Sequence, residues 1–157
     1  MPTRRTRAAS RAAGLSRADR QPVVVGGRQS AVGPGLVTRA VRTVLDGERR
    51  QLPVSVSFIG PDRMRRLNAE WKGHQRPTDV LAFTLAGPQG DLIGDIYICP
   101  AVARDQAKSL DISVREELLR LVIHGTLHVL GYDHPAGSRR NRSVMWRKQE
   151  RYLACVD

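Results

Sequence analysis

The chain has 157 residues, of which 41% are hydrophobic and 26% charged, a composition typical of one folded domain and not of a disordered protein. No stretch approaches the roughly 18 apolar residues of a membrane span, and Cys99 and Cys155 are too few and too far apart for a disulfide-rich scaffold. The sequence therefore predicts no membrane association and a reducing compartment, the cytoplasm. Its net charge of +11 favours a polyanionic partner.

Residues 1–21 are expected to form a disordered, arginine-rich arm. The first twenty residues hold six arginines against one acidic residue, Asp19, and show no apolar periodicity. Such an arm could contact RNA, could be a transit peptide that directs the protein to an organelle, or could have no role. A single folded domain is expected over residues 22–157.

Within this domain, alternating apolar residues predict strands, and apolar residues at three- and four-residue spacing predict helices. The expected order is a strand at 22–25, a helix at 35–45, a strand at 54–58, a short helix around 62–67, a polar loop at 72–79, strands at 80–85 and 92–99, and helices at 101–110, 114–130 and 143–154. Asp62 is expected to cap the second helix, and Asp111 or Ser113 the fourth, which Gly131 should end. This order predicts an α+β domain with one small, mixed, four-stranded sheet and about five helices.

Three of the four histidines of the chain fall within eleven residues. His124 and His128 are four residues apart on the predicted fourth helix, so both imidazoles project from one face. After Gly131 the chain can turn back and bring His134 to the same place. Three imidazoles predict a site for one Zn²⁺ ion with an open fourth position, the pattern of catalytic zinc sites.

The spacing H-x-x-x-H-x-x-G-x-x-H is also that of metzincin proteases, which makes a zincin-like metal helix the expected local structure. Those proteases need a glutamate as general base directly after the first histidine, and Gly125 stands at that position. A zinc metalloprotease is therefore the less favoured interpretation of this metal site.

The histidine segment from His124 to His134 resembles the H-G-x-L-H-L-x-G-Y-D-H signature of the YbeY family of rRNA maturation endoribonucleases, with Val129 in place of the second leucine. Blocks around Leu67-Asn68, Pro77–Phe83 and Ile93–Ile96 agree in order and spacing, so the resemblance covers roughly residues 22–154. It implies a metal-dependent endoribonuclease that cuts single-stranded RNA in maturation of the small-subunit rRNA 3′ end and in ribosome quality control. The implied partners are rRNA and the small ribosomal subunit.

Several basic residues are candidates for binding RNA around this metal. Lys72, where the family usually has arginine, is expected to stabilise the phosphate or the transition state, with help from Arg76. Arg139 and Arg140 belong to a basic cluster after residue 138, which could contact RNA or form a solvated helix face. A zinc-stabilised ribosome-binding factor without nuclease turnover would carry the same charges.

Two acidic residues lie close to the predicted ligands in the sequence. Glu117, two helical turns before His124, could orient a ligand imidazole, pair with Arg120 or face solvent. Asp133 could shape the turn before His134, accept a hydrogen bond near the metal or act as a catalytic acid.

Overall fold

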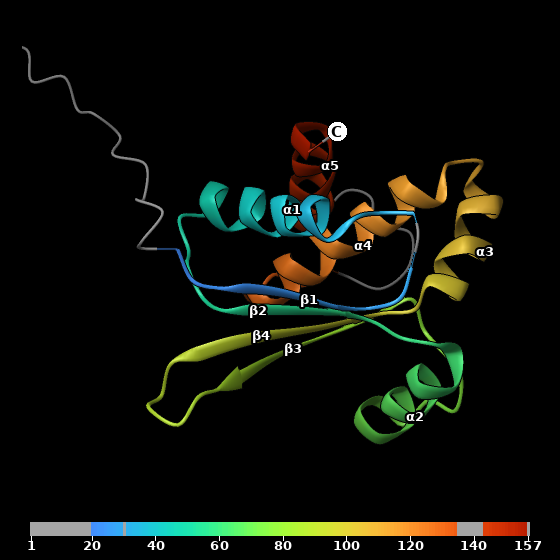
Figure 1. Cartoon of the computed structure of the whole chain (residues 1–157), viewed down its shortest axis with the longest axis horizontal. Helices are drawn as coiled ribbons and strands as arrows, with labels where there is room; N and C mark the ends of the chain where they lie inside the picture. The colour runs from blue at the N-terminus through green and yellow to red at the C-terminus, as the bar shows by residue number, and fades with distance from the viewer. Residues whose placement is uncertain (1–19, 30, 135–142, 157) are drawn as a thin grey trace, which may run out of the picture.

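A computed structural model describes residues 20–29, 31–134 and 143–156. Four strands form one sheet, with α1, α3, α4 and α5 on one side of it and α2 on the other (Figure 1). The elements are β1 (Val23–Gly27), α1 (Pro34–Gly47), β2 (Val54–Phe58), α2 (Pro61–Lys72), β3 (Val80–Ala86), β4 (Leu92–Ile98), α3 (Pro100–Leu110), α4 (Val114–Val129) and α5 (Val144–Val156). The predicted α+β class, mixed four-stranded sheet and five helices are confirmed for these residues.

The sheet has the strand order β1-β2-β4-β3. β1, β2 and β4 are parallel, and β3 joins the edge as the antiparallel partner of β4. In β2, Val54, Val56 and Phe58 are buried, whereas Ser55 and Ser57 between them are not. The alternation seen in the sequence therefore separates a face toward the main helices from a more polar face.

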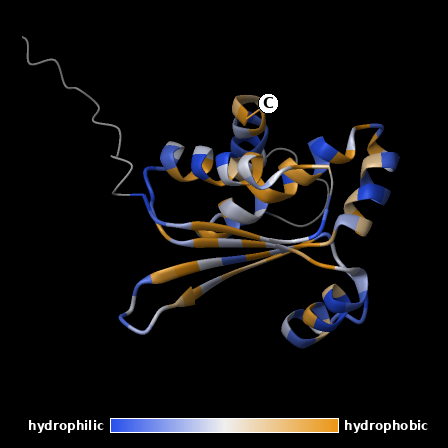
Figure 2. Ribbon diagram, viewed as in Figure 1, coloured by the Kyte–Doolittle hydropathy of each residue, from blue (hydrophilic) through white to orange (hydrophobic). Residues whose placement is uncertain are grey.

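Helix α4 lies at the centre of the helical layer and packs against α1, α3, α5, β3 and β4. It is hydrophobic around most of its circumference, as a helix covered on all sides must be (Figure 2). Its partners in the core include Val41 and Leu45 of α1, Ile96 and Ile98 of β4, and Met145 of α5. The site described next is thus built on the most deeply packed helix of the domain.

The structure corrects one predicted helix cap and decides another. Asp62 was expected to cap α2, but Gly60 is the N-cap, Pro61 opens the helix, and Asp62 lies in the first turn, where it pairs with Arg65 at 3.0 Å. For α4 the cap is Ser113, whose hydroxyl accepts a 3.0 Å hydrogen bond from the Glu116 amide. Asp111 instead ends α3 in a left-handed conformation, φ 54°.

Candidate metal centre

The end of α4 and the turn after it place the third histidine. Gly131 takes φ 97°, a value that favours glycine, and the amides of Gly131 and Tyr132 donate to the carbonyls of His128 and Leu127. These two hydrogen bonds define a Schellman motif, which ends the helix and reverses the chain. The segment that carries His134 therefore returns toward the helix face from which His124 projects, as predicted.

The three imidazoles converge on one point. The His124 ring centroid lies 4.6 Å from that of His128 and 5.2 Å from that of His134, and the His128 and His134 centroids are 5.2 Å apart. One nitrogen from each ring lies within 4.8 Å of the others. His124 is buried and the other two rings are partly exposed, so the site is open on one side.

A glutamine on α5 fixes the tautomer of His124. Gln149 is 2% exposed; its Nε2 donates to the Glu150 carboxylate at 3.2 Å, so its Oε1 faces His124 Nδ1 at 2.7 Å. Because an amide oxygen only accepts, His124 Nδ1 carries the proton and Nε2 keeps its lone pair. This is the arrangement by which a ligand histidine is oriented for a metal.

His134 supplies a further test of whether the residues fit a metal ion. Its Nδ1 atom is buried and has no hydrogen-bond partner among the described residues. A buried nitrogen without a partner is costly in a protein that binds nothing there. Three converging imidazoles, one of them oriented by Gln149, suit a zinc-like transition metal, and the residues therefore fit the predicted ion.

The imidazoles line a cavity of about 310 Å³ between α4 and the start of β3. Its remaining lining residues are Lys72, Thr78, Asp79, Val80, Leu81 and Ala82. Lys72, the last residue of α2, lines this cavity, and Gly73 after it, at φ 72°, ends the helix in a left-handed turn. The buried Asn68 amide then donates to the Arg76 carbonyl at 2.8 Å and holds the following loop against α2.

Gly125 lies on the side of α4 that meets the sheet. A Cβ atom there would lie 2.8 Å from Ile96 Cγ2 and 3.4 Å from Val80 Cγ2. Only glycine allows α4 to approach β3 and β4 this closely without displacing a neighbour. A glutamate at this position would point into the sheet, so α4 has no room for the general base of a metzincin protease.

The structure places the two acidic candidates differently. Glu117 is buried and its carboxylate lies 3.4 Å from Arg120; burial raises the pKa of Glu117 despite that guanidinium. Pairing with Arg120 is therefore confirmed, and exposure of Glu117 to solvent was wrong. Asp133 is exposed, and its carboxylate accepts a 2.8 Å hydrogen bond from the His134 amide, which fits the role of shaping the turn.

The RNA-binding candidates are not gathered at the metal cavity. Arg76 is exposed and does not line that cavity, although its loop lies beside it. Arg139 and Arg140 lie outside the described residues, as do residues 1–19 of the predicted arm. Of the basic candidates, the described structure places Lys72 beside the histidines.

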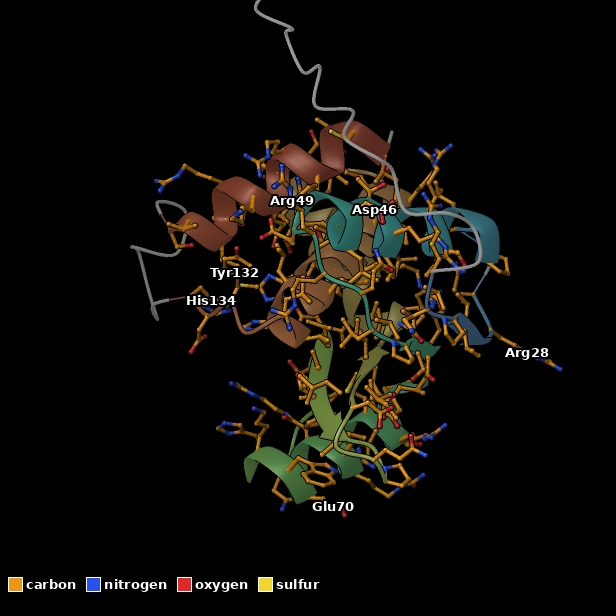
Figure 3. All side chains as sticks on the ribbon, turned by 90° about the vertical axis from the view of Figure 1, so that its left-hand side faces the viewer. Arg28, Asp46, Arg49, Glu70, Tyr132 and His134 are labelled. Atoms are coloured by element: carbon orange, nitrogen blue, oxygen red, sulfur yellow. The ribbon has the colours of Figure 1, made fainter. Side chains whose placement is uncertain are left out.

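A partly buried carboxylate, absent from the sequence-based candidates, anchors the segment that carries His134. Glu48, at the end of α1, accepts hydrogen bonds from Tyr132 and Tyr152 hydroxyls at 2.5 Å and from Lys148 at 2.8 Å. Tyr132 and His134 lie together on the segment after α4 (Figure 3). Burial alone would raise the pKa of Glu48, but these hydrogen bonds outweigh it and lower the pKa to about 2.

Comparison with known proteins gives the family. The family described as endoribonuclease YbeY matches residues 34–157. An endoribonuclease YbeY of Thermotoga petrophila is 35% identical over 117 residues, which cover 74% of this chain and 76% of the relative. One from Pelotomaculum thermopropionicum is 37% identical over 146 residues, which cover 84% and 95%. The chain belongs to the YbeY family.

The solution structure of TM1509 from Thermotoga maritima is similar in fold to this YbeY-family chain. The TM-score is 0.60 and the sequences are 30% identical, with 86% of this chain and 89% of the other covered. The resemblance drawn from the histidine signature and the predicted fold are therefore confirmed.

Membership in the YbeY family also decides between the two readings of the histidine motif. The relatives are named endoribonucleases, so the nuclease interpretation is confirmed over the metalloprotease alternative, in agreement with the packing of Gly125. RNA is the substrate class of the family, and the relatives are bacterial proteins. Among the described residues, no helix is both long and apolar enough to cross a membrane.

Proposed function

We propose that this chain cleaves single-stranded rRNA internally, with one Zn²⁺ ion held by His124, His128 and His134, during maturation of the small-subunit 3′ end and in ribosome quality control. The observation that carries the proposal is the convergence of three imidazoles in a cavity that Lys72 also lines. Family membership supports RNA as the substrate. The cytoplasm, where bacterial rRNA is matured, is the proposed location.

Each residue of the site has a defined task in this proposal. His124 offers Nε2 because Gln149 engages Nδ1, and the burial of both side chains keeps that imidazole in place. A Zn²⁺ ion held by the three histidines would supply Lewis-acid chemistry, which polarises a phosphodiester oxygen and lowers the pKa of a water molecule. Lys72 places a positive charge where the phosphorane develops negative charge.

The remaining basic residues are proposed to bring RNA to the cavity. Arg76 lies in the loop between Lys72 and β3, and its exposed guanidinium is available to a phosphate of the substrate. Arg139 and Arg140 are proposed to add phosphate contacts from the segment after His134. Such contacts strengthen binding without reading sequence, and their contribution should fall with salt.

The test is cleavage of an RNA that carries the small-subunit 3′ end, with zinc-loaded wild type and His128→Ala purified in parallel. Bound metal is measured in both proteins, and circular dichroism checks that both are folded. We expect wild type to cut the RNA at a rate that chelation abolishes and zinc restores, and the variant to lose both metal and cleavage. His74→Ala is the matched control, because His74 is an exposed histidine outside the metal cluster.

Other outcomes would contradict the proposal in different ways. Equal cutting by wild type and His128→Ala would assign the activity to a contaminant. Binding of RNA by both proteins without cutting would favour the accessory-factor function. Cleavage that returns with another divalent metal but not with zinc would retain the nuclease and refute zinc as its ion.

A further inference from the structure

A second and larger cavity, of about 550 Å³, shares lining residues with the metal cavity. The two cavities share His124 and Asp79 as walls, so they adjoin. Residues from α3, α4 and α5 line the larger one: Val102, Asp105, Gln106, Ser109, Leu110, Glu117, Arg120, Leu121, Trp146 and Gln149. Its volume is within the range of pockets that bind small organic ligands.

The chemistry of this cavity differs from that of the metal cavity. Its lining includes three carboxylates, those of Asp79, Asp105 and Glu117, and one guanidinium, that of Arg120. Arg120 is itself held by salt bridges of 2.9–3.4 Å to Glu116, Glu117 and Glu150. A phosphate would therefore be repelled here, whereas an N–H donor would be accepted.

The walls also suit a flat, aromatic ligand. Trp146 is partly exposed at the cavity and offers an aromatic surface, and Val102, Leu110 and Leu121 add apolar contacts. Gln106 stands at the polar end, where its Nε2 donates to Asp79 at 3.1 Å. An aromatic wall combined with a few hydrogen-bonding groups is how proteins recognise an unstacked base.

We propose that this cavity binds the nucleobase next to the scissile phosphate, an inference that rests on the proposed nuclease function. The nucleotide then lies across His124, with its phosphate at the imidazoles and Lys72 and its base beside Trp146. A base can enter only when it is unpaired and unstacked, so the cavity also gives a physical reason for cutting single strands.

The carboxylates of Glu117 and Asp79, which line the larger cavity, further predict which bases bind. Guanine, cytosine and adenine carry an exocyclic amino group that can donate to Glu117 or Asp79. Uracil has only one N–H, flanked by two carbonyl oxygens, and a carboxylate would repel those oxygens. The cavity should therefore prefer an amino-bearing base over uracil by about fivefold or more, the low end of what one polar base contact supplies.

Tryptophan fluorescence tests the proposal directly and without cleavage. The chain has two tryptophans, and Trp71 is 57% exposed on α2, so Trp71→Phe leaves Trp146 as the sole reporter. This protein, zinc-loaded, is titrated with GMP, CMP, AMP and UMP, with free tryptophan as the correction for light absorption. We expect saturable quenching by the first three nucleotides, at concentrations about fivefold or more below that needed for UMP.

Two variants in this background separate base recognition from general effects. Glu117→Gln keeps the size of the side chain but removes one of the two carboxylates that can accept from the base, so the preference against UMP should be reduced. Glu116→Gln is the matched control: Glu116 is the neighbour on α4, also pairs with Arg120, and does not line the cavity. If Glu117→Gln fails to fold, Gln106→Leu, which removes the amide at the polar end, should weaken quenching instead.

The outcomes keep this proposal distinct from the nuclease function. Cleavage of RNA by the wild type without saturable quenching by any nucleotide would refute the base site and leave the function standing. Equal quenching by all four nucleotides, unchanged by Glu117→Gln, would also refute it. Selective quenching without cleavage of any RNA would uphold the site as a base-binding pocket and refute the nuclease.

Discussion

Replacing Gln149 by leucine tests how the metal centre is held. The Gln149 side chain is 2% exposed, and its Oε1 lies 2.7 Å from His124 Nδ1. Leucine has a similar volume, so the substitution preserves packing while it removes this hydrogen bond. The imidazole N–H of the buried His124 is then left without its acceptor.

The size of the effect follows from these contacts. An unsatisfied buried donor costs about 1–3 kcal/mol, so the metal-free protein should lose stability by that order. Loss of a partner that orients a ligand histidine typically weakens metal binding ten- to a hundredfold, or about 1.4–2.7 kcal/mol. We therefore expect Gln149→Leu to fold, to unfold at lower urea concentration, and to bind zinc ten- to a hundredfold more weakly.

Zinc affinity is measured by competition with a chromophoric chelator at neutral pH, and stability by urea unfolding of the metal-free protein. Gln106→Leu is the control, because it removes a side-chain amide that donates to Asp79 and does not contact His124. A folded Gln149→Leu protein with wild-type zinc affinity would refute the idea that this hydrogen bond orients a ligand.

Three further predictions concern the helix, the carboxylate anchor and the phosphate charge. Gly125→Ala gains about 1 kcal/mol of helix propensity, but the added methyl group crowds Ile96 at a cost of about 1–3 kcal/mol. Urea unfolding should therefore show a net loss of stability near 1 kcal/mol, and a variant more stable than wild type would contradict the packing argument. Because the pKa of Glu48 is lowered to about 2, the contribution of its carboxylate to the free energy of unfolding is full above about pH 4.5 and is lost as the pH falls toward 2. In urea unfolding, acidification should therefore cost the wild type at most about 3 kcal/mol more than it costs Glu48→Gln. Equal losses would show that the hydrogen bonds of Glu48 contribute nothing. Lys72→Ala should slow RNA cleavage roughly hundredfold with zinc affinity unchanged and Lys72→Arg should preserve the rate, whereas full activity of the alanine variant would remove Lys72 from the mechanism.

The parts of this fold that the sequence predicts well are those decided by local periodicity. Val54, Val56 and Phe58 alternate with serines, and the structure buries the first set and not the second. Likewise, two histidines four residues apart on one helix must share a face, and Gly131 is the residue type that reverses a chain after a helix. Local geometry therefore sufficed to predict that the three histidines meet.

The expected cap of α2 shows where such local rules fail. Asp62 is a good capping residue, but Pro61 before it is already suited to the first helical position, since it needs no amide partner there. The helix therefore begins at Pro61, and Gly60 takes the cap position, two residues before Asp62. An aspartate in the first turn still interacts favourably with the helix dipole, so its position alone did not distinguish the two roles.

Residues that act across the packing of distant elements were beyond local prediction. Gln149 meets His124 only because α5 packs on α4, and Glu48 meets Tyr132 and Lys148 only because α1 ends beside both. A signal for Gln149 does exist in the sequence. It is a polar residue four positions after Met145 on the buried face of the last helix, and a polar group so placed needs a partner.

The packing of α4 decides where charge for the reaction can come from. The helix carries two of the three converging histidines, yet Gly125, next to His124, must stay without a side chain because it rests on Ile96. Helix α4 therefore supplies imidazoles but no carboxylate directly after the first histidine. Lys72, a cation that lines the metal cavity, comes from α2. A phosphodiester is anionic and needs positive charge around it, so it suits a site of imidazoles and a lysine. A peptide suits this site less well, because the metzincin mechanism of hydrolysis needs a carboxylate base beside the first histidine.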